Sequence, residues 1–264
     1  MKEKDDTMSI DEESVSSSSS IEERIRRSVA DRNWGVQLKI ALSCRKLAIE
    51  GHAQTLAGQV TVRAKDDTVW TNQLLGGFAS LTQSTVIRVN DDLDVMEGNG
   101  IPNPGMRFHL WVYKARPDIN AIVHTHPPYA SALAMTGREL AIAHMDAAMF
   151  YDDCAYLPEW PGVPLSDVEG KLVSEALGGK RSLLLSNHGL MTTGENLETA
   201  VYLAMQFERA SRLQLLAESV GNIKPVKDEH ASEAHDFLLS DGVVIGQFYS
   251  WADRLLKEQP EVED

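Results

Sequence analysis

The sequence predicts a single α/β domain built on a mixed sheet. Short runs rich in β-branched residues follow one another in the first third of the chain, and a later apolar run has the length of a buried strand. Segments with helical spacing of apolar residues lie between and after these runs. Strands interleaved with helices indicate an α/β architecture. The close spacing of the early strands favours antiparallel pairing there.

The N-terminal segment differs in composition from the rest of the chain. Residues 1–19 are charged and serine-rich, so we expect a disordered tail, followed by one folded domain over 20–264. Ser20 and Glu23 have the spacing of a helix capping box, which predicts that ordered structure begins at Ser20. Apolar residues at helical spacing then continue to about Glu50 and predict one or two amphipathic helices.

The remaining elements alternate along the chain. Glycines and prolines between 98 and 105 mark a loop. Helical spacing predicts helices over about 106–116, 127–136, 167–177 and 197–220, and a helical C-terminal extension after them. The expected strands cover 59–62, 68–71, 85–89, 121–124 and 181–186, of which the last is apolar enough to be covered on both faces.

Composition excludes several classes of protein. With 25 basic and 39 acidic residues the net charge is −14, and such a field repels phosphate backbones, so we expect no nucleic-acid partner. No stretch approaches the ~20 apolar residues that cross a bilayer, and the N-terminus lacks the apolar core of a secretory signal. We therefore expect no membrane partner and a cytoplasmic location. Cys44 and Cys154 are too few for a disulfide framework.

Three histidines at expected strand ends are the sharpest local feature. His124 and His126 are two residues apart, and in an extended segment such side chains point to the same side. His188 follows the strand 181–186, so all three rings could surround one ion if that strand lies beside 121–124. Three imidazoles leave open positions for a substrate, as a catalytic metal site requires. On the residues alone, structural histidines remain an alternative.

The segments around these histidines resemble the class II aldolase/adducin family. Arg107 to Pro127 is similar to the family's helix followed by RPDxNAVxHTHP, and Leu184 to Leu190 is similar to its LLxxNHGL signature. The resemblance covers about residues 35–220. It implies a three-layer α/β/α domain around a mostly antiparallel sheet, a homotetramer, and one divalent ion (Zn, Mn or Fe) on the three matching histidines. In the family's enzymes the ion acts as a Lewis acid while a carbon–carbon bond of a small molecule breaks.

Departures from the family pattern argue against a sugar-phosphate substrate. The family's P-S-S-E segment, whose glutamate is the acid/base, corresponds to 102–105, so Gly105 stands at the glutamate position. Its phosphate-binding G-T-x-G-N element corresponds to 55–59, where Leu56 and Ala57 offer no hydroxyl to a phosphate. The second phosphate element, T-P-S-G, corresponds to Thr71-Asn72-Gln73-Leu74.

These departures favour a metal-dependent lyase, above all a decarboxylase of a hydroxy-aromatic or related carboxylic acid, because decarboxylation does not need the aldolase glutamate. His109 lies four residues after Gly105, about 40° around the expected helix, and is the candidate catalytic proton donor. Arg107 is a candidate to bind a substrate carboxylate, although its helical phase also suits a structural ion pair. Tyr151 is a second candidate substrate-binding residue, in a segment that the family can offer to a neighbouring subunit.

Three alternatives remain open. The first is a non-haem Fe(II) oxygenase that cleaves an aryl-pyruvate or a mandelate-like acid, since three histidines can hold Fe(II). The second is an aldolase that acts on a non-phosphorylated substrate. The third is a non-catalytic, adducin-like scaffold that shares the fold.

Overall fold

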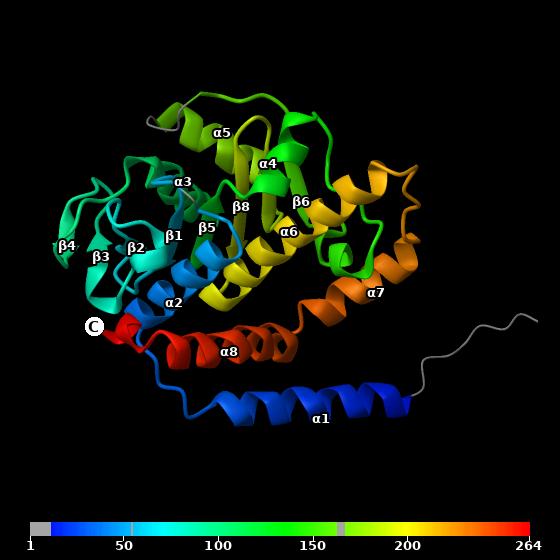
Figure 1. Ribbon diagram of the computed structural model, residues 1–264, viewed down its shortest axis with the longest axis horizontal. Coiled ribbons are helices and arrows are strands. Elements are labelled where there is room, and N and C mark those ends of the chain that lie inside the picture. The colour runs from blue at the N-terminus through cyan, green and yellow to red at the C-terminus, as the bar shows by residue number, and fades with distance from the viewer. Residues whose placement is uncertain (1–11, 54, 163–166) are drawn as a thin grey trace, which may run out of the picture.

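The computed structural model describes residues 12–53, 55–162 and 167–264. At its centre lies an eight-stranded sheet in the order β4-β3-β2-β1-β5-β8-β7-β6, with helices on both sides (Figure 1). Every pair of neighbouring strands is antiparallel except β6 and β7, which are parallel. The expected three-layer α/β/α domain with a mixed, mostly antiparallel sheet is therefore confirmed.

The first half of the sheet is an antiparallel meander, as the spacing of the early runs predicts. The strands are β1 (Gln59–Arg63), β2 (Val69–Asn72), β3 (Val86–Val89) and β4 (Val95–Glu97). Strand β4 was not predicted from the sequence. All three of its residues are exposed, so it lacks the apolar alternation by which a half-buried strand is recognised.

The second half of the sheet has a strand order that the sequence left open. Its strands are β5 (Ala121–Thr125), β6 (Cys154–Leu157), β7 (Ser182–Leu185) and β8 (Gly189–Gly194). Segment 181–186 does not lie directly beside 121–124, the arrangement considered from the sequence, because β8 pairs with both β5 and β7 and separates them. The chain reverses between β7 and β8 at Asn187, whose φ of 54° is a left-handed conformation that asparagine tolerates.

Helices cover the two faces of the sheet. Alternate residues of β5 show the division, because Ile122 packs with α3 and α5, whereas Ala121 and Val123 pack with α2, α6 and α8. The α-helices are α1 (Glu12–Val29), α2 (Val36–Ile49), α3 (Arg107–Ala115), α4 (Pro128–Met135), α5 (Asp167–Leu177), α6 (Leu197–Glu218), α7 (Asp228–Leu238) and α8 (Asp241–Glu258). Short 3-10 turns are η1 (Phe78–Ser80), η2 (Gln83–Thr85), η3 (Pro104–Met106), η4 (Met145–Phe150) and η5 (Pro260–Glu263).

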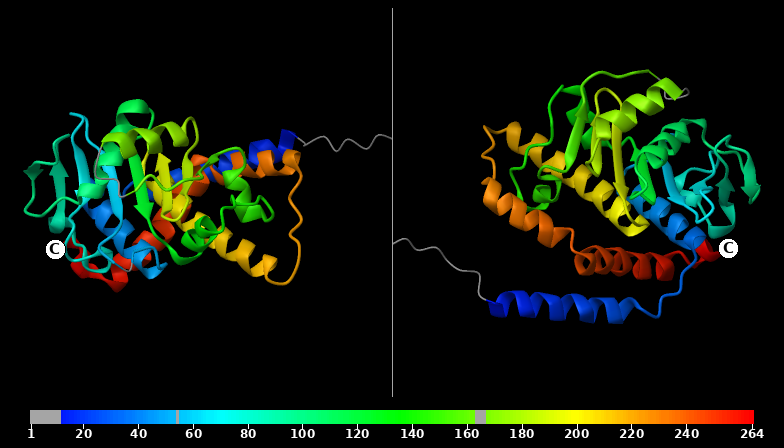
Figure 2. Two further views of the ribbon diagram at one scale, coloured as in Figure 1. Left: turned by 90° about the horizontal axis from the view of Figure 1, so that it is seen from above. Right: turned by 180° about the vertical axis from the view of Figure 1, so that it is seen from behind.

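The first helix begins earlier than the capping-box pattern predicts. Helix α1 starts at Glu12, so Ser20 lies inside it and does not cap it. Residues 1–11 of the expected tail lie outside the described residues. Helix α1 runs beside α8 (Figure 1 and the right-hand view of Figure 2), and Arg26 pairs with Asp241 at 2.8 Å between them. The C-terminal extension is helical, as expected, and α8 packs on the same chain.

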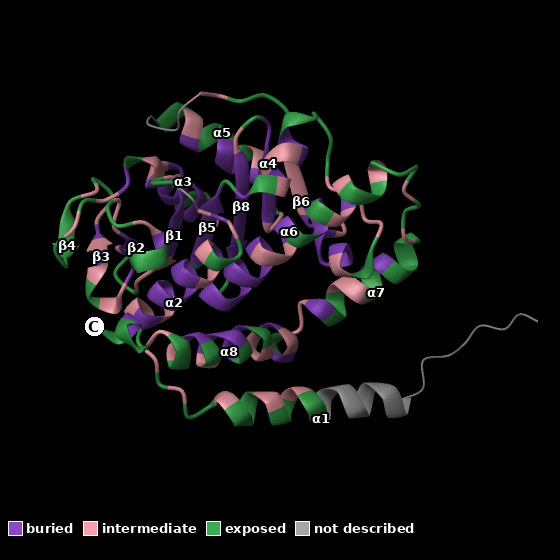
Figure 3. Ribbon diagram, viewed as in Figure 1, coloured by how far each residue is buried: buried purple, intermediate pink, exposed green. Residues whose placement is uncertain are grey.

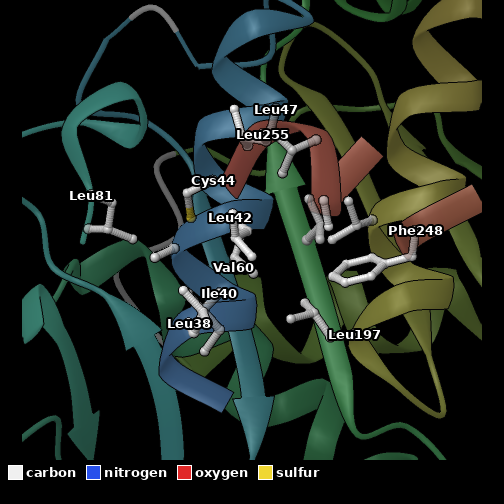
Figure 4. Packing of buried hydrophobic residues seen from close by; sticks show 14 of the residues in the cluster. Leu38, Ile40, Leu42, Cys44, Leu47, Val60, Leu81, Leu197, Phe248 and Leu255 are labelled. Carbon is white, nitrogen blue, oxygen red and sulfur yellow. The ribbon is translucent and has the colours of Figure 1, made fainter. Parts of the chain in front are cut away.

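The largest apolar cluster fills the space between the sheet, α2 and α8. Leu42 from α2, Val60 from β1 and Phe248 from α8 meet there (Figure 4). Figure 3 shows the same division, with buried residues in the sheet and on the helix faces turned toward it. Among the described residues, no helix has both the length and the apolar character needed to cross a bilayer.

Candidate metal centre

The three histidines singled out by the sequence meet at one end of the sheet. The ring centroids of His124 and His126 are 4.9 Å apart, those of His124 and His188 are 4.9 Å apart, and those of His126 and His188 are 4.7 Å apart. One nitrogen from each ring can be chosen so that all three lie within 4.8 Å of one another. The three rings therefore form a nearly equilateral triangle.

Local backbone geometry explains how the three rings converge. His124 is in β5 and His126 directly follows it, and the alternation of an extended chain turns both toward the same side while Thr125 points to the other. On that other side the Thr125 hydroxyl lies 2.9 Å from Nδ1 of the buried His52. His188 is carried by the turn between β7 and β8, and β8 pairs with β5.

Glu208 of α6 fixes the chain just after His126. Its two carboxylate oxygens accept hydrogen bonds from the backbone N–H groups of Tyr129 and Ala130, at 2.9 and 2.8 Å. These groups lie in the first turn of α4, whose N-cap residue, Pro127, supplies no side-chain acceptor. Unsatisfied N–H groups at a helix start favour a carboxylate. The carboxylate therefore holds the turn that carries His126.

Gly189 allows the His126 ring to approach β8. A Cβ at this position would lie 2.6 Å from Cδ2 of His126 and 2.6 Å from the carbonyl oxygen of Thr125. Both distances are far below van der Waals contact, so any side chain at 189 would displace the ring or the strand. The glycine that follows His188 in the sequence is thus required by close packing at the site.

The protonation states of the three rings suit metal binding. Nδ1 of His124 lies 3.0 Å from the carbonyl oxygen of Leu190, which accepts the proton of that nitrogen and leaves Nε2 free as a ligand. Burial lowers the pKa of His124, and the neighbouring His188 and His126 lower it further. Burial also lowers the pKa of His126, and it lowers that of His188 to about 4. All three rings are therefore neutral at neutral pH, as ligands must be.

A divalent ion fits this donor set. Nε2 of His124 and Nε2 of His126 are 3.1 Å apart, a separation that two ligands bound about 2.0–2.1 Å from one ion can adopt. Nδ1 of His188 is buried and has no hydrogen-bond partner among the residues that the structure describes. Imidazole is a common ligand of zinc, iron and other transition metals. Three imidazoles also leave coordination positions open, which distinguishes a catalytic site from a closed structural one.

Comparison with known proteins agrees with the fold. The model of the family described as "Class II Aldolase and Adducin N-terminal domain" matches residues 38–215. The chain belongs to the class II aldolase/adducin family. The match includes β5, the turn carrying His188 and most of α6, and so all three histidines lie within the family domain.

The names of similar proteins describe different activities. The chain is 31% identical over 207 residues to a protein of Streptomyces roseochromogenus subsp. oscitans named 4-hydroxy-3-prenylphenylpyruvate oxygenase/4-hydroxy-3-prenylbenzoate synthase, covering 76% of this chain and 75% of that protein. It is also 31% identical to the decarboxylase NovR of Streptomyces niveus, with 76% and 77% covered. The L-fuculose 1-phosphate aldolase of Glaciozyma antarctica PI12 superposes with a TM-score of 0.79 at 29% identity, covering 86% and 91%. Membership of this family supports an enzyme.

His109 lies close to the three histidines. Its ring centroid is 6.4 Å from that of His124, with the two planes at 89°, and the Phe108 ring contacts both. The ring is fully buried, and burial lowers its pKa to about 3. Nδ1 lies 2.8 Å from the hydroxyl of Thr61, whereas Nε2 is buried and has no partner in the described part of the chain. His109 is therefore a neutral imidazole with one uncommitted nitrogen.

The other two sequence candidates are placed differently. Arg107 is the first residue of α3 and is half-buried, and none of the ion pairs found among the described residues includes it. Tyr151 follows η4 and precedes β6. Strands β6 and β7 are parallel, and His188 follows the end of β7, so Tyr151 lies toward the opposite end of the sheet from His188. Within one chain Tyr151 is not brought to the triad.

Gln59 is a site residue that the sequence analysis considered only as part of an eroded phosphate element. It lies opposite His124 in the β1–β5 pair, so the two side chains share a face. The side chain is buried, and its Oε1 has no hydrogen-bond partner within the described ranges. A Cβ at Gly105, the position of the family's glutamate, would lie 3.2 Å from Gln59 Nε2. No signal in the sequence could reveal this contact, because it depends on the register of β1 against β5.

Proposed function

We propose that this protein is a metal-dependent lyase that decarboxylates a hydroxy-aromatic or related carboxylic acid. The observation that carries the proposal is the combination at one site of a complete histidine triad with a glycine at position 105. The three histidines would hold a divalent ion, which can polarise a substrate oxygen. The glycine removes the acid/base side chain that the family's sugar-phosphate enzymes use, and the Gln59 amide stands beside it instead.

Exposed apolar side chains in the segments that flank Gln59 and Gly105 favour an apolar substrate over a phosphorylated one. Leu56 is 53% exposed and Ile101 is 54% exposed. The carbonyl of Leu56 accepts a hydrogen bond from Asn103, and that of Ile101 accepts one from the backbone of Leu74 at 2.8 Å, which joins these segments. The family's phosphate-binding elements correspond to the segments of Leu56 and Leu74. Apolar side chains there suit the ring of an aromatic acid.

The proposed reaction breaks the bond between the substrate carbon and its carboxylate. The electron pair of that bond stays on the carbon, carbon dioxide leaves, and a proton from solvent takes its place. A divalent ion (Zn, Mn or Fe) on His124, His126 and His188 would act as a Lewis acid toward a substrate oxygen. His109 remains the candidate catalytic residue. Because the neutral ring carries only one proton, we propose that it acts as a hydrogen-bond donor, in place of the full proton donor that the sequence suggests.

The names of the relatives support this substrate class. One relative at 31% identity is named as a decarboxylase. A second relative, also 31% identical, has a name that contains two aromatic acids, 4-hydroxy-3-prenylphenylpyruvate and 4-hydroxy-3-prenylbenzoate. The second name also contains the word oxygenase, which supports a second candidate: a non-haem Fe(II) oxygenase that cleaves an aryl-pyruvate or mandelate-like acid. A three-histidine site suits both chemistries.

Carbon dioxide release from a panel of hydroxy-aromatic acids and aryl-pyruvates tests the proposal. Release should occur without oxygen, stop on treatment with a chelator, and be absent in His124→Ala. His230→Ala is the matched control, because that ring is exposed on α7. Activity only in the presence of oxygen and iron would establish the oxygenase instead. Activity on non-phosphorylated aldol substrates would establish the aldolase alternative, and failure to bind metal would revive the non-catalytic scaffold.

Assembly and substrate contacts outside the triad are also part of the proposal. We propose a homotetramer, in which Tyr151 could reach the site of a neighbouring subunit, and Arg107 as a contact for the substrate carboxylate. Sedimentation analysis tests the tetramer. An unchanged KM and kcat in Tyr151→Phe would show that the Tyr151 hydroxyl does not act at the site. A cytoplasmic location remains a prediction.

A further inference from the structure

Three buried polar side chains form a chain of hydrogen bonds beside His124. The hydroxyl of Tyr113 in α3 lies 2.8 Å from Oγ1 of Thr61 in β1, and the same Oγ1 lies 2.8 Å from Nδ1 of His109. Thr61 and His109 are fully buried, and Tyr113 is 6% exposed. Thr61 pairs with Ile122 in β5, two residues before His124, so the chain lies on the face of the sheet that carries His124.

Counting protons decides the direction of these hydrogen bonds. The Thr61 hydroxyl has one proton and is shared by two neighbours. If Tyr113 donates to Thr61 and Thr61 donates to His109 Nδ1, every hydroxyl proton is used and the ring proton sits on Nε2. If His109 Nδ1 donates instead, either the Tyr113 proton or the Thr61 proton has no acceptor among the contacts of these three side chains, whereas Nε2 is unpaired in both arrangements and does not distinguish them. An unpaired buried polar group costs about 1–3 kcal/mol, so the first arrangement is favoured.

The surroundings of Tyr113 hold it in the donor role. Its pKa is raised, because burial outweighs the opposing effects of Thr61 and Arg63, and the hydroxyl therefore keeps its proton. The guanidinium of Arg63 stacks on the ring, 4.8 Å from its centroid, and donates a hydrogen bond to the Tyr113 carbonyl. Tyr113 is thus fixed both through its ring and through its backbone.

We propose that Tyr113 and Thr61 are positioning residues that hold His109 in the tautomer with its proton on Nε2. Nε2 has no partner among the described residues, and the His109 ring lies 6.4 Å from that of His124. The hydrogen bonds from Tyr113 through Thr61 therefore leave Nε2 of His109 as a neutral hydrogen-bond donor, in fixed orientation, beside the candidate metal centre. That this N–H group donates to a substrate oxygen rests on the proposed function, whereas the tautomer itself does not.

Nitrogen-15 NMR of the histidine-labelled, purified full chain tests the tautomer directly, because protonated and unprotonated ring nitrogens have well-separated shifts. The His109 signals are assigned by their loss in His109→Gln. We expect the wild type to show protonated Nε2 and unprotonated Nδ1. In Thr61→Val, which removes the hydroxyl, the pattern should change, and in Thr61→Ser it should be kept. A wild-type signal with the proton on Nδ1, or a Thr61→Val spectrum identical to the wild type, would overturn the inference.

Two controls separate positioning from general damage to the fold. Thr192→Val removes another fully buried strand hydroxyl, one that donates to the Ala200 carbonyl at 2.8 Å, and should leave the His109 signals unchanged. Tyr113→Phe removes the first donor of the chain but keeps the ring, and should shift part of the His109 population to the other tautomer. An unaltered tautomer in Tyr113→Phe would show that Tyr113 does not help to hold His109 in that tautomer.

Kinetics then separates this inference from the proposed function. If the proposed reaction is correct, Thr61→Val should lower kcat about tenfold or more with a smaller change in KM, while metal content stays at the wild-type value. If the protein proves to have another activity, the NMR experiment still tests the tautomer of His109 independently of the reaction. A tautomer that changes in Thr61→Val with no change in kcat would leave His109 without a role in the reaction.

Discussion

The side-chain amide of Gln59 stands in the space that a side chain at position 105 would enter. A Cβ at Gly105 would lie 3.2 Å from Gln59 Nε2 and 3.2 Å from Asn103 Oδ1. Gln59 is also the strand partner of His124. Position 105 and the amide of Gln59 therefore share one space beside the three histidines.

Restoring glutamate at position 105 should fail while Gln59 is present. Gly105→Glu is expected to lower the free energy of unfolding by about 1–3 kcal/mol, because the new side chain overpacks against the amide. Gln59→Ala should relieve much of that cost in the double variant, with a coupling energy of about 0.5–3 kcal/mol. Urea denaturation of the four proteins measures it. Strictly additive effects would show that the two side chains do not compete.

Each of the three ligand histidines should be needed for metal binding. His124→Ala, His126→Ala and His188→Ala are each expected to lose most of the bound metal, since two imidazoles hold a divalent ion far more weakly than three. Elemental analysis of the purified proteins measures the metal per chain. His230→Ala should retain it. Full metal content in His188→Ala would show that the turn between β7 and β8 does not contribute a ligand.

Gly189→Ala should weaken metal binding without removing a ligand. The added Cβ would lie 2.6 Å from the His126 ring, so the ring must shift, and we expect an affinity about 10–100-fold lower, as for changes that disturb ligand orientation. Competition with a chromophoric chelator measures the affinity. Gly179→Ala is the matched control, because a Cβ there meets nothing within 4 Å. Equal affinities of the two variants would mean that the site adapts freely.

The metal-free protein should lose stability as the pH falls below about 6.5. Burial lowers the pKa of His52 and of His109 to about 3, so between pH 6.5 and 3 the unfolded chain binds protons that the folded chain does not. The free energy of unfolding must therefore decrease as the pH falls through this range. Urea denaturation with a chelator present, at several pH values, should show a shallower dependence in His52→Asn. An unchanged slope would indicate that His52 is protonated in the folded state.

Local patterns in the sequence determined much of the site. The i, i+2 spacing of His124 and His126 places both rings on one side of an extended chain wherever that chain lies in the sheet. The apolar run before His188 predicted a buried strand, and β7 is fully buried. Apolar spacing likewise predicted α5 and α6, because helical periodicity is a property of consecutive residues.

Only the tertiary structure decided which strands are neighbours. Strand β8, bounded by Gly189 and Gly194, carries threonines that look exposed in the sequence, yet the whole strand is buried between β5 and β7. The contacts of Gln59 with the space at Gly105, and of Thr61 with His109, arise from the register of β1 against β5 and from the way α3 packs on them. Residues distant in sequence meet through packing, and no local pattern encodes that distance. The sequence by itself singled out the three histidines, and the tertiary structure determined what surrounds them.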